Sequence, residues 1–587
     1  MENAQTQDRQ PESVEPTAEG AKRGRGRPRG RGKQKEEKPK GKPGRPRGSR
    51  QFNPLPDFFN AVLSFLFSRA FQSLCHLANI PDHRKDPKQC TFPIFQIRIC
   101  ELLWMLSGGK SGLFYDDFLL EPQTAEAVGE FCRRFNQPYA QNSDGTVRMP
   151  TVDTLKDDME TMPPGELERV WHILVQELDA INLFRGTRYE NMPIFAIDGV
   201  DGFRTACVVP KLLHRKTTGK GDEKREEYYA KFALASLCHP IGGAGFPVAG
   251  MMVKNKEDGG TVDGQATKQQ CEYNALEEML IRVTSLFPGL RCLVSLDGLY
   301  LDGNNIRLFE KLNQYYGMTF KDDDLAKLHV TVEKELKKRG GHYTTEYKYD
   351  NICEKSEVWY CNDIKHNFSG VDTPEMNYLY LIVTIFENDI ETKTLKFGWM
   401  TNLRLDAANS LHVGLILRRH WGVETMNNDL KHLGMNLTHK FDSRGNGPEN
   451  FATMGFIAAL LQSVLRDSNF MEKVENQPVT VPPCGKAAKA KDIEEKKESQ
   501  IQVTVHEAPE GEENKPVEKA MESLRLFLDR RRRIKADIAR IRIKRRWHTR
   551  EGWCDYLCRS MQQTSPEFKP LKIPVFTMLW NLTNQKT

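Results

Sequence analysis

The fold expected for this chain follows from the stretch Pro193-Ile194-Phe195-Ala196-Ile197-Asp198, a short apolar run that ends in an aspartate. A second run of this kind is Cys292-Leu293-Val294-Ser295-Leu296-Asp297. Short apolar runs bounded by glycine are typical of buried strands, so each aspartate is predicted to end a strand. A third acid, Glu424, lies in a segment with helical period. Together, these three carboxylates could supply the oxygen ligands that hard divalent cations prefer.

Taken singly, each aspartate has another interpretation, as a turn or cap residue. The dipeptides Asp198-Gly199 and Asp297-Gly298 are favoured in turns, which strengthens that alternative. The combination with Glu424 favours a metal site, because paired ions can clamp both oxygens of an in-line phosphoryl displacement. The nearby Asp201 and Asp302 are interpreted as turn or cap residues.

The composition of the 587 residues, 39% hydrophobic and 28% charged, is ordinary for a soluble globular protein with several domains. The net charge of +6 is unevenly spread, because residues 21–50 carry fourteen Lys and Arg against two Glu. Such a tail indicates a nucleic acid or another anionic partner. Scattered cysteines and the absence of a signal-peptide pattern favour a reducing compartment. The apolar run 456–465 is shorter than the ~20 residues that span a bilayer, so no membrane segment is expected.

The composition divides the chain into five predicted parts. A basic tail that almost lacks hydrophobic residues is expected to be disordered when unbound. A mostly helical domain, an α/β catalytic domain, a linker and a basic C-terminal helix with its tail follow. These parts span 1–50, 51–190, 191–470, 471–516 and 517–587.

Within the catalytic domain, periods of two and of 3.6 residues alternate, as in an α/β sheet. A β-rich insertion is expected at about 320–405, between Asp297 and Glu424. The other expected elements are strands at 193–198, 203–208, 227–238, 245–254 and 292–297 and helices at 269–286, 303–314, 407–432 and 451–465.

The helix around Glu424 resembles the signature helix of bacterial insertion-sequence DDE transposases. Its stretch His420-Trp421-Gly422-Val423-Glu424 is similar to the His-Trp-Gly-Ile-Glu run of the H-repeat-associated group. The stretches Ala196-Ile197-Asp198-Gly199 and Ile80-Pro81-Asp82-His83-Arg84-Lys85 resemble the same group, and the likeness covers roughly residues 70–465. Two strand-end aspartates separated by a strand–strand–helix block and followed by a helical glutamate also resemble the order in ribonuclease H-like nucleases.

The resemblance implies a ribonuclease H-like catalytic core whose carboxylates Asp198, Asp297 and Glu424 bind Mg²⁺, with Mn²⁺ as a substitute. It implies water attack on a phosphodiester at a transposon end, then attack of the freed 3′-hydroxyl on a target strand. A homodimer on double-stranded DNA is implied as well. Lys431, two turns after Glu424, matches a family lysine that contacts the DNA end.

Other residues of this segment have more open roles. Arg418 and Arg419 either contact phosphates or form a solvated face. His420 is assigned to DNA binding; it is what the closer group carries where the wider family has Arg. Leu417 stands where that family has Tyr, which removes a hydroxyl contact. Trp421 could stack on a base, although an aromatic residue here is more often part of the core.

Two motifs in the tail resemble AT-hooks: Arg25-Gly26-Arg27-Pro28-Arg29-Gly30 and Gly44-Arg45-Pro46-Arg47-Gly48. Narrow A·T-rich minor grooves are strongly negative and attract inserted arginines. The predicted groove ligands are Arg25, Arg27, Arg29, Arg45 and Arg47. A nonspecific polycation or a localisation signal is the alternative.

The sequence therefore predicts a DNA transposase associated with chromosomal DNA, in the cytoplasm or, in a eukaryote, in the nucleus. One alternative is a non-catalytic DNA-binding protein derived from a transposase. Another is a ribonuclease H-like nuclease without strand transfer. Cys353, Cys361 and His366 do not keep zinc-ligand spacing, so no structural zinc is assigned.

Overall fold

The computed structural model describes the central part of the chain. The hook-like motifs and the C-terminal part expected from 517 lie outside the described residues. Those residues are 69–106, 115, 122–180, 183–205, 213–218, 225–240, 245–254, 264–321, 325–349, 351–368, 370–432, 435–442, 444–467 and 503–506.

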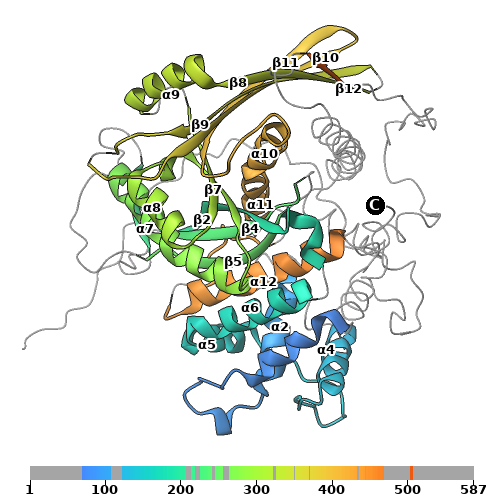
Figure 1. Ribbon diagram of the computed structural model, residues 1–587. Helices are drawn as coiled ribbons and strands as arrows, with labels where there is room; N and C mark the ends of the chain where they lie inside the picture. Colours follow the sequence, from blue (N-terminus) through green and yellow to red (C-terminus); the bar gives the residue numbers. More distant parts are fainter. Residues whose placement is uncertain are drawn as a thin grey trace, which may run out of the picture. The chain divides into compact units, whose positions relative to one another are not determined.

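A mixed α/β fold is built on one large sheet (Figure 1). Its first seven strands are β1 (Arg188–Tyr189), β2 (Met192–Thr205), β3 (His214–Thr218), β4 (Arg225–Leu237), β5 (Phe246–Met252), β6 (Leu293–Leu296) and β7 (Tyr315–Thr319). The strand order is β5-β4-β2-β6-β7, and β1 and β3 pair with β2 and β4. The pairs β2–β6 and β6–β7 are parallel, whereas β2–β4 and β4–β5 are antiparallel.

The region of the predicted insertion extends the same sheet with antiparallel strands. They are β8 (Gly341–Tyr349), β9 (Ile352–Ile364), β10 (Met376–Glu387), β11 (Ile390–Thr401) and β12 (Val503–His506). Because β11 pairs with β7, the sheet continues in the order β7-β11-β10-β9-β8-β12. Two elements here were not expected. Helix α9 (Ala326–Arg339) buries Leu328 and Val332, a narrow apolar stripe, and β12 lies in the predicted linker.

Helices pack against both parts of the sheet and against one another. They are α2 (Ile94–Leu106), α4 (Pro122–Arg134), α5 (Val152–Thr161), α6 (Pro164–Ala180), α7 (Gly264–Leu286), α8 (Gly303–Lys311), α10 (Ser410–Leu417), α11 (His420–His432) and α12 (Gly447–Asp467), with 3₁₀ helices at Arg69–Asn79, Pro87–Gln89, Leu183–Thr187 and Gly298–Tyr300. None of the described helices has the length and apolar character needed to cross a bilayer.

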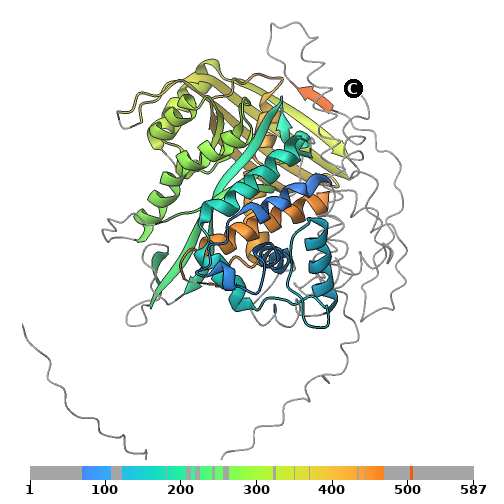
Figure 2. The same ribbon diagram turned by 90° about the horizontal axis from the view of Figure 1, so that it is seen from below.

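Alternate residues of β2 separate two hydrophobic clusters. Phe195 and Ile197 belong to the cluster that includes α2, α5, α6, α7 and α12. Ile194 and Ala196 face the other way, into a cluster with α10 and β8–β11. Figure 2 shows α12, in orange, beside the helices in blue and teal. The helices predicted as an N-terminal domain therefore share a core with the sheet.

Most of the elements expected for the catalytic region are present, and two expectations are wrong. The strands expected at 193–198 and 203–208 are the single strand β2, whose register shifts between Asp201 and Arg204. Asp198 therefore does not end a strand as predicted, because its backbone pairs with Leu234 within β2. The helix expected at 407–432 is two helices, because the hydroxyl of Ser295 donates a 2.9 Å hydrogen bond to the carbonyl of Leu417. That carbonyl is thereby satisfied by the sheet at the junction between α10 and α11.

Candidate functional site

Asp198 and Asp297 lie side by side in the register of two parallel strands. Ala196 of β2 is the Cα partner of Ser295 of β6, so the two aspartates follow at the same offset. Neighbouring strands are about 4.8 Å apart, and residues two apart point to the same face. The face that Ala196 shares is that of the second hydrophobic cluster, towards α10. The parallel pairing of β2 and β6 therefore brings the two predicted carboxylates together, with Asp198 inside β2 and Asp297 directly after β6.

Both aspartates are fixed locally by the glycine that follows. One carboxylate oxygen of Asp198 accepts a hydrogen bond from Gly199 N at 2.8 Å, and one of Asp297 accepts from Gly298 N at 2.6 Å. Asp297 is also the N-cap of a short 3₁₀ helix. The capping interpretation is therefore correct for Asp297 in local geometry, and it leaves the second carboxylate oxygen available.

The environment of Asp198 makes its negative charge costly. Burial raises the pKa of Asp198, and the neighbouring Asp297 raises it further, while His420 and Lys231 act to lower it. Lys231 is fully buried and is the register partner of Asp201 in β4. A carboxylate with a raised pKa beside a second carboxylate is typical of sites that bind cations, since a bound cation compensates both charges.

Helix α11 is anchored on Asp198 of β2 and on Ser295 of β6. The side-chain amide of Asn427 donates a 2.9 Å hydrogen bond to Asp198, and His420 Nδ1 lies 3.3 Å from the Ser295 carbonyl oxygen. Glu424 is four residues after His420 and three before Asn427, so all three share a helix face. The side chain of Glu424 itself is exposed. The helix therefore brings Glu424 to the region of the two aspartates.

The donor set suits a hard cation only in part. Asp198 and Asp297 offer adjacent carboxylate oxygens, as Mg²⁺ requires. However, among the residues described, no three His, Cys, Asp or Glu side chains form a group that could hold a metal ion. The exposed carboxylate of Glu424 is therefore not grouped with the two aspartates in this structure.

The other predicted residues of this segment have separate contacts. Arg418 lies over the ring of Phe397, 4.7 Å from its centroid, and Arg419 donates to the Pro240 carbonyl at 3.2 Å. Lys431 is partly exposed. Trp421 is 64% exposed, so its interpretation as a core residue is wrong. DNA contacts by these side chains stay predictions.

Three residues near the aspartates were not singled out from the sequence: Asn427, Lys231 and Lys321. Helical spacing from Glu424 could have found Asn427. Nothing in the sequence could have found Lys231, because its place depends on strand pairing. Lys321 follows β7, an unpredicted strand, and its ammonium lies 3.7 Å from a carboxylate oxygen of Asp297.

The upstream Ile80-Pro81-Asp82-His83-Arg84 motif has a structural role. The buried guanidinium of Arg98 donates to the carbonyls of Ile80 and Pro81, at 2.6 and 2.9 Å. Arg84 donates in turn to Asp82, at 2.9 Å from Nε. These bonds tie the motif to α2.

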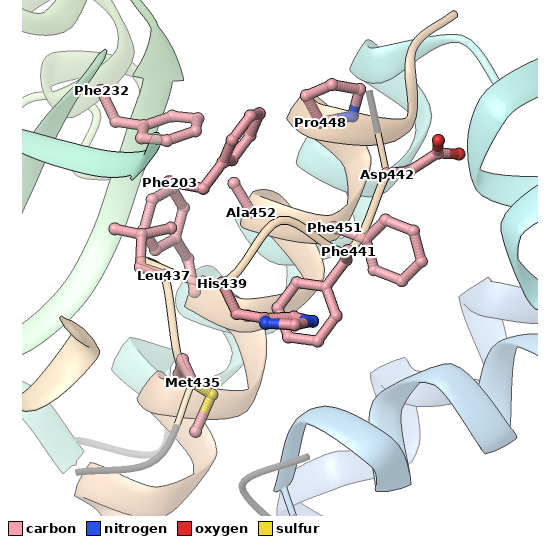
Figure 3. A pocket seen from close by; sticks show the side chains of 12 residues that line it. Phe203, Phe232, Met435, Leu437, His439, Phe441, Asp442, Pro448, Phe451 and Ala452 are labelled. Atoms are coloured by element: carbon pink, nitrogen blue, oxygen red, sulfur yellow. The ribbon is translucent and has the colours of Figure 1, made fainter. Parts of the chain in front are cut away.

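A pocket lies apart from the carboxylates, between β2, β4 and α12 (Figure 3). Its lining is mostly aromatic and aliphatic, with His439 and Asp442 as its polar side chains; the labelled residues are Phe203, Phe232, Met435, Leu437, His439, Phe441, Asp442, Pro448, Phe451 and Ala452. Asp442 is already paired with Arg444 at 3.5 Å. The pocket therefore lies at the edge of the hydrophobic core, and none of the predicted site residues lines it.

Comparison with known proteins gives little further information. No family model matches this chain, and no curated protein matches it. One solved structure that is similar is the cryo-EM structure of the piggyBac transposase synaptic complex with hairpin DNA. The match has 12% sequence identity and a TM-score of 0.30, and covers 72% of this chain and 77% of that one. At this TM-score the match does not establish a common fold.

Proposed function

We propose that this chain is a DDE-type DNA transposase of the insertion-sequence, H-repeat-associated kind, with a ribonuclease H-like core. Its reaction would be metal-dependent cleavage at a transposon end, followed by transfer of the freed 3′-hydroxyl end to a target strand. The proposed partner is double-stranded DNA bound by a homodimer, with the hook-like motifs in an A·T-rich minor groove. The protein would act where chromosomal DNA lies, in the bacterial cytoplasm or a eukaryotic nucleus.

The observation that carries this proposal is that Asp198, inside β2, and Asp297, directly after β6, both follow the parallel register pair Ala196 and Ser295 by two residues. Between them in the chain lie β3, β4, β5 and α7, and β4, β5 and α7 correspond to the strand–strand–helix block that the resemblance calls for. The late helix α11 then binds Asp198 through Asn427 and carries Glu424 on the same face. Each of these features depends on chain segments far apart in sequence.

In the proposed reaction the carboxylates act as ligands. Asp198 would hold a cation through an oxygen oriented by Asn427, and Asp297 through its solvent-facing side; Glu424 would complete the set. A bound Mg²⁺ or Mn²⁺ would lower the pKa of the attacking water and neutralise charge on the scissile phosphate. Lys431, further along α11, is proposed to contact the DNA end.

The alternative function, a non-catalytic DNA-binding protein, is favoured by one observation. The described residues contain no ready-made group of three metal-binding side chains. If Glu424 cannot turn towards the aspartates, the pair alone would bind a divalent cation weakly.

Strand cleavage by the full-length protein tests the proposal. The substrate is a plasmid carrying the coding region with its natural flanking DNA, incubated with Mg²⁺ or Mn²⁺. We expect Asp198→Ala and Asp297→Ala to reduce cleavage by about three orders of magnitude or more while DNA binding persists. The matched control is Asp302→Asn, which changes an acid that caps α8.

Each possible outcome of this experiment supports a different one of the three hypotheses. Metal-dependent cuts with joined products support the transposase. Cuts without joined products favour the nuclease without strand transfer. Binding without cleavage by the wild-type protein favours the DNA-binding alternative.

A further inference from the structure

Lys321 reaches the proposed metal site from a strand other than those that carry the aspartates. It follows β7, which is the parallel neighbour of β6. The hydroxyl of Thr319 donates to the Leu296 carbonyl at 3.2 Å, which ties the end of β7 to the residue before Asp297. The Lys321 ammonium then lies 3.7 Å from Asp297.

The backbone of Lys321 is held from its other side by α9. The ring of His329 stacks on Phe320, with 4.0 Å between ring centroids. The same ring places Nε2 2.6 Å from the Lys321 carbonyl oxygen. Phe320 is itself buried in the core. Packing therefore fixes the backbone of Lys321, whereas its side chain is 60% exposed.

The ion pair itself is weak. The side chains of Lys321 and Asp297 are 60% and 49% exposed, and pairs this exposed contribute little to stability. Such a lysine can exchange one anionic partner for another at low cost. A phosphate of bound DNA would be the available anion once the charge of Asp297 is compensated by a cation.

We infer that Lys321 is a phosphate ligand of the DNA strand that is bound at the two aspartates. It pairs with Asp297 in the metal-free protein and turns to a non-bridging phosphate oxygen once Asp297 carries a divalent cation. This inference rests on the proposed function, and it makes two predictions that do not require turnover. In the absence of DNA, Lys321 competes with the metal ion for Asp297. In the presence of DNA, it contributes one ionic contact to a phosphate.

Three variants of the full chain test the inference: Lys321→Met, Lys321→Arg and Lys311→Met. Lys311 is the matched control, because its ammonium pairs with Glu277 at 3.6 Å with side chains 72% and 58% exposed. In titrations with Mn²⁺ alone, Lys321→Met should bind the ion about fivefold more tightly than the wild type, since a positive charge 3.7 Å from an Asp297 carboxylate oxygen is removed. Lys321→Arg and Lys311→Met should bind it like the wild type.

The second measurement is the salt dependence of binding to a short DNA duplex with Mg²⁺ present. Loss of one phosphate contact should reduce the slope of log affinity against log salt by about one in Lys321→Met and leave it unchanged in Lys321→Arg. Equal or weaker Mn²⁺ binding by Lys321→Met, or an unchanged slope, would overturn the inference. A wild-type protein that binds no Mn²⁺ would instead count against the proposed function itself.

Discussion

The two Asp-Gly dipeptides of the sheet have the same local sequence but different surroundings. Asp198-Gly199 lies inside β2, whereas Asp297-Gly298 follows the end of β6. The Asp198 corner consists of Asp198 and Gly199 with Asn427 of α11 bound to the carboxylate. The Asp297 corner consists of Asp297 and Gly298, with Lys321 as an exposed partner. At both aspartates, the backbone amide of the following glycine donates a hydrogen bond to one carboxylate oxygen.

The comparison shows that a local motif fixes the backbone but not the chemistry of its side chain. Asp198 is covered by a helix from late in the chain, so burial raises its pKa. Asp297 remains half in solvent and its partner is exchangeable. One corner is therefore set by tertiary packing, and the other by its own turn.

The largest expected effect is the loss of stability in acid at α10, the helix that packs in the same hydrophobic cluster as Ile194 and Ala196 of β2. Burial lowers the pKa of His412 on α10 to about 4, from a normal value of 6.5. A histidine that folds in its neutral form stabilises the protein above the unfolded pKa, and this stability is lost as the pH falls from about 6.5 to about 4. The loss should be about 3 kcal/mol in the free energy of unfolding.

Denaturant unfolding of wild type and His412→Gln at several pH values measures this effect. The variant should lose less stability between pH 7 and 4 than the wild type does. His172 and His214, whose pKa values are also lowered by burial, remain in both proteins and serve as an internal control. Parallel pH profiles would contradict the assignment to His412.

Removal of the amide at the Asp198 corner should have the next largest effect. Asn427→Ala deletes the buried donor to Asp198, which should cost about 1–2 kcal/mol in unfolding free energy. The reason is that the carboxylate is left without its tertiary partner. Metal-dependent cleavage should fall as well. Asn304→Ala, on helix α8, is the control, because no hydrogen bond links Asn304 to Asp198 among the described residues, and equal effects of both changes would remove the distinction between the corners.

Neutralising each aspartate compares the corners directly. Because the folded pKa of Asp198 is raised, its ionised form destabilises the folded protein above that pKa, so Asp198→Asn should increase stability at pH 7. Asp297→Asn loses an exposed ion pair and also the repulsion with Asp198, two effects of opposite sign, and should change stability by less than about 1 kcal/mol. Thermal unfolding of the two variants in metal-free buffer makes the measurement. A destabilised Asp198→Asn protein would show that the charge is already compensated.

Deletion of residues 1–50 should have the smallest effect on either corner. We expect unchanged unfolding and unchanged Mn²⁺ binding, because these depend on the sheet. Affinity for A·T-rich DNA should fall and its salt dependence should flatten, as fewer phosphate contacts release fewer counterions. An unchanged salt slope would argue against a DNA-binding role for the hook-like motifs.

Sequence patterns were most informative where one strand or helix carries its own signal. The apolar runs before Asp198 and Asp297 predicted β2 and β6 correctly, because both faces of these strands are buried. The patterns failed at Asp201, which was interpreted as a turn or cap residue but lies within β2. At the next residue, Gly202, a Cβ would lie 2.7 Å from the ring of Phe232, so glycine is needed for close packing. They also missed α9, whose two buried residues give little period.

The sequence by itself determined that Asp297 follows the end of a strand, which helix carries Glu424, and where basic charge is concentrated. Such features depend on neighbours within a few residues, and side-chain periodicity records them. Only the tertiary structure decided that Asp198 and Asp297 share a register, that Asn427 orients one of them and that Lys321 approaches the other. These contacts join segments many residues apart, and their energies depend on burial and distance, which a linear pattern does not contain.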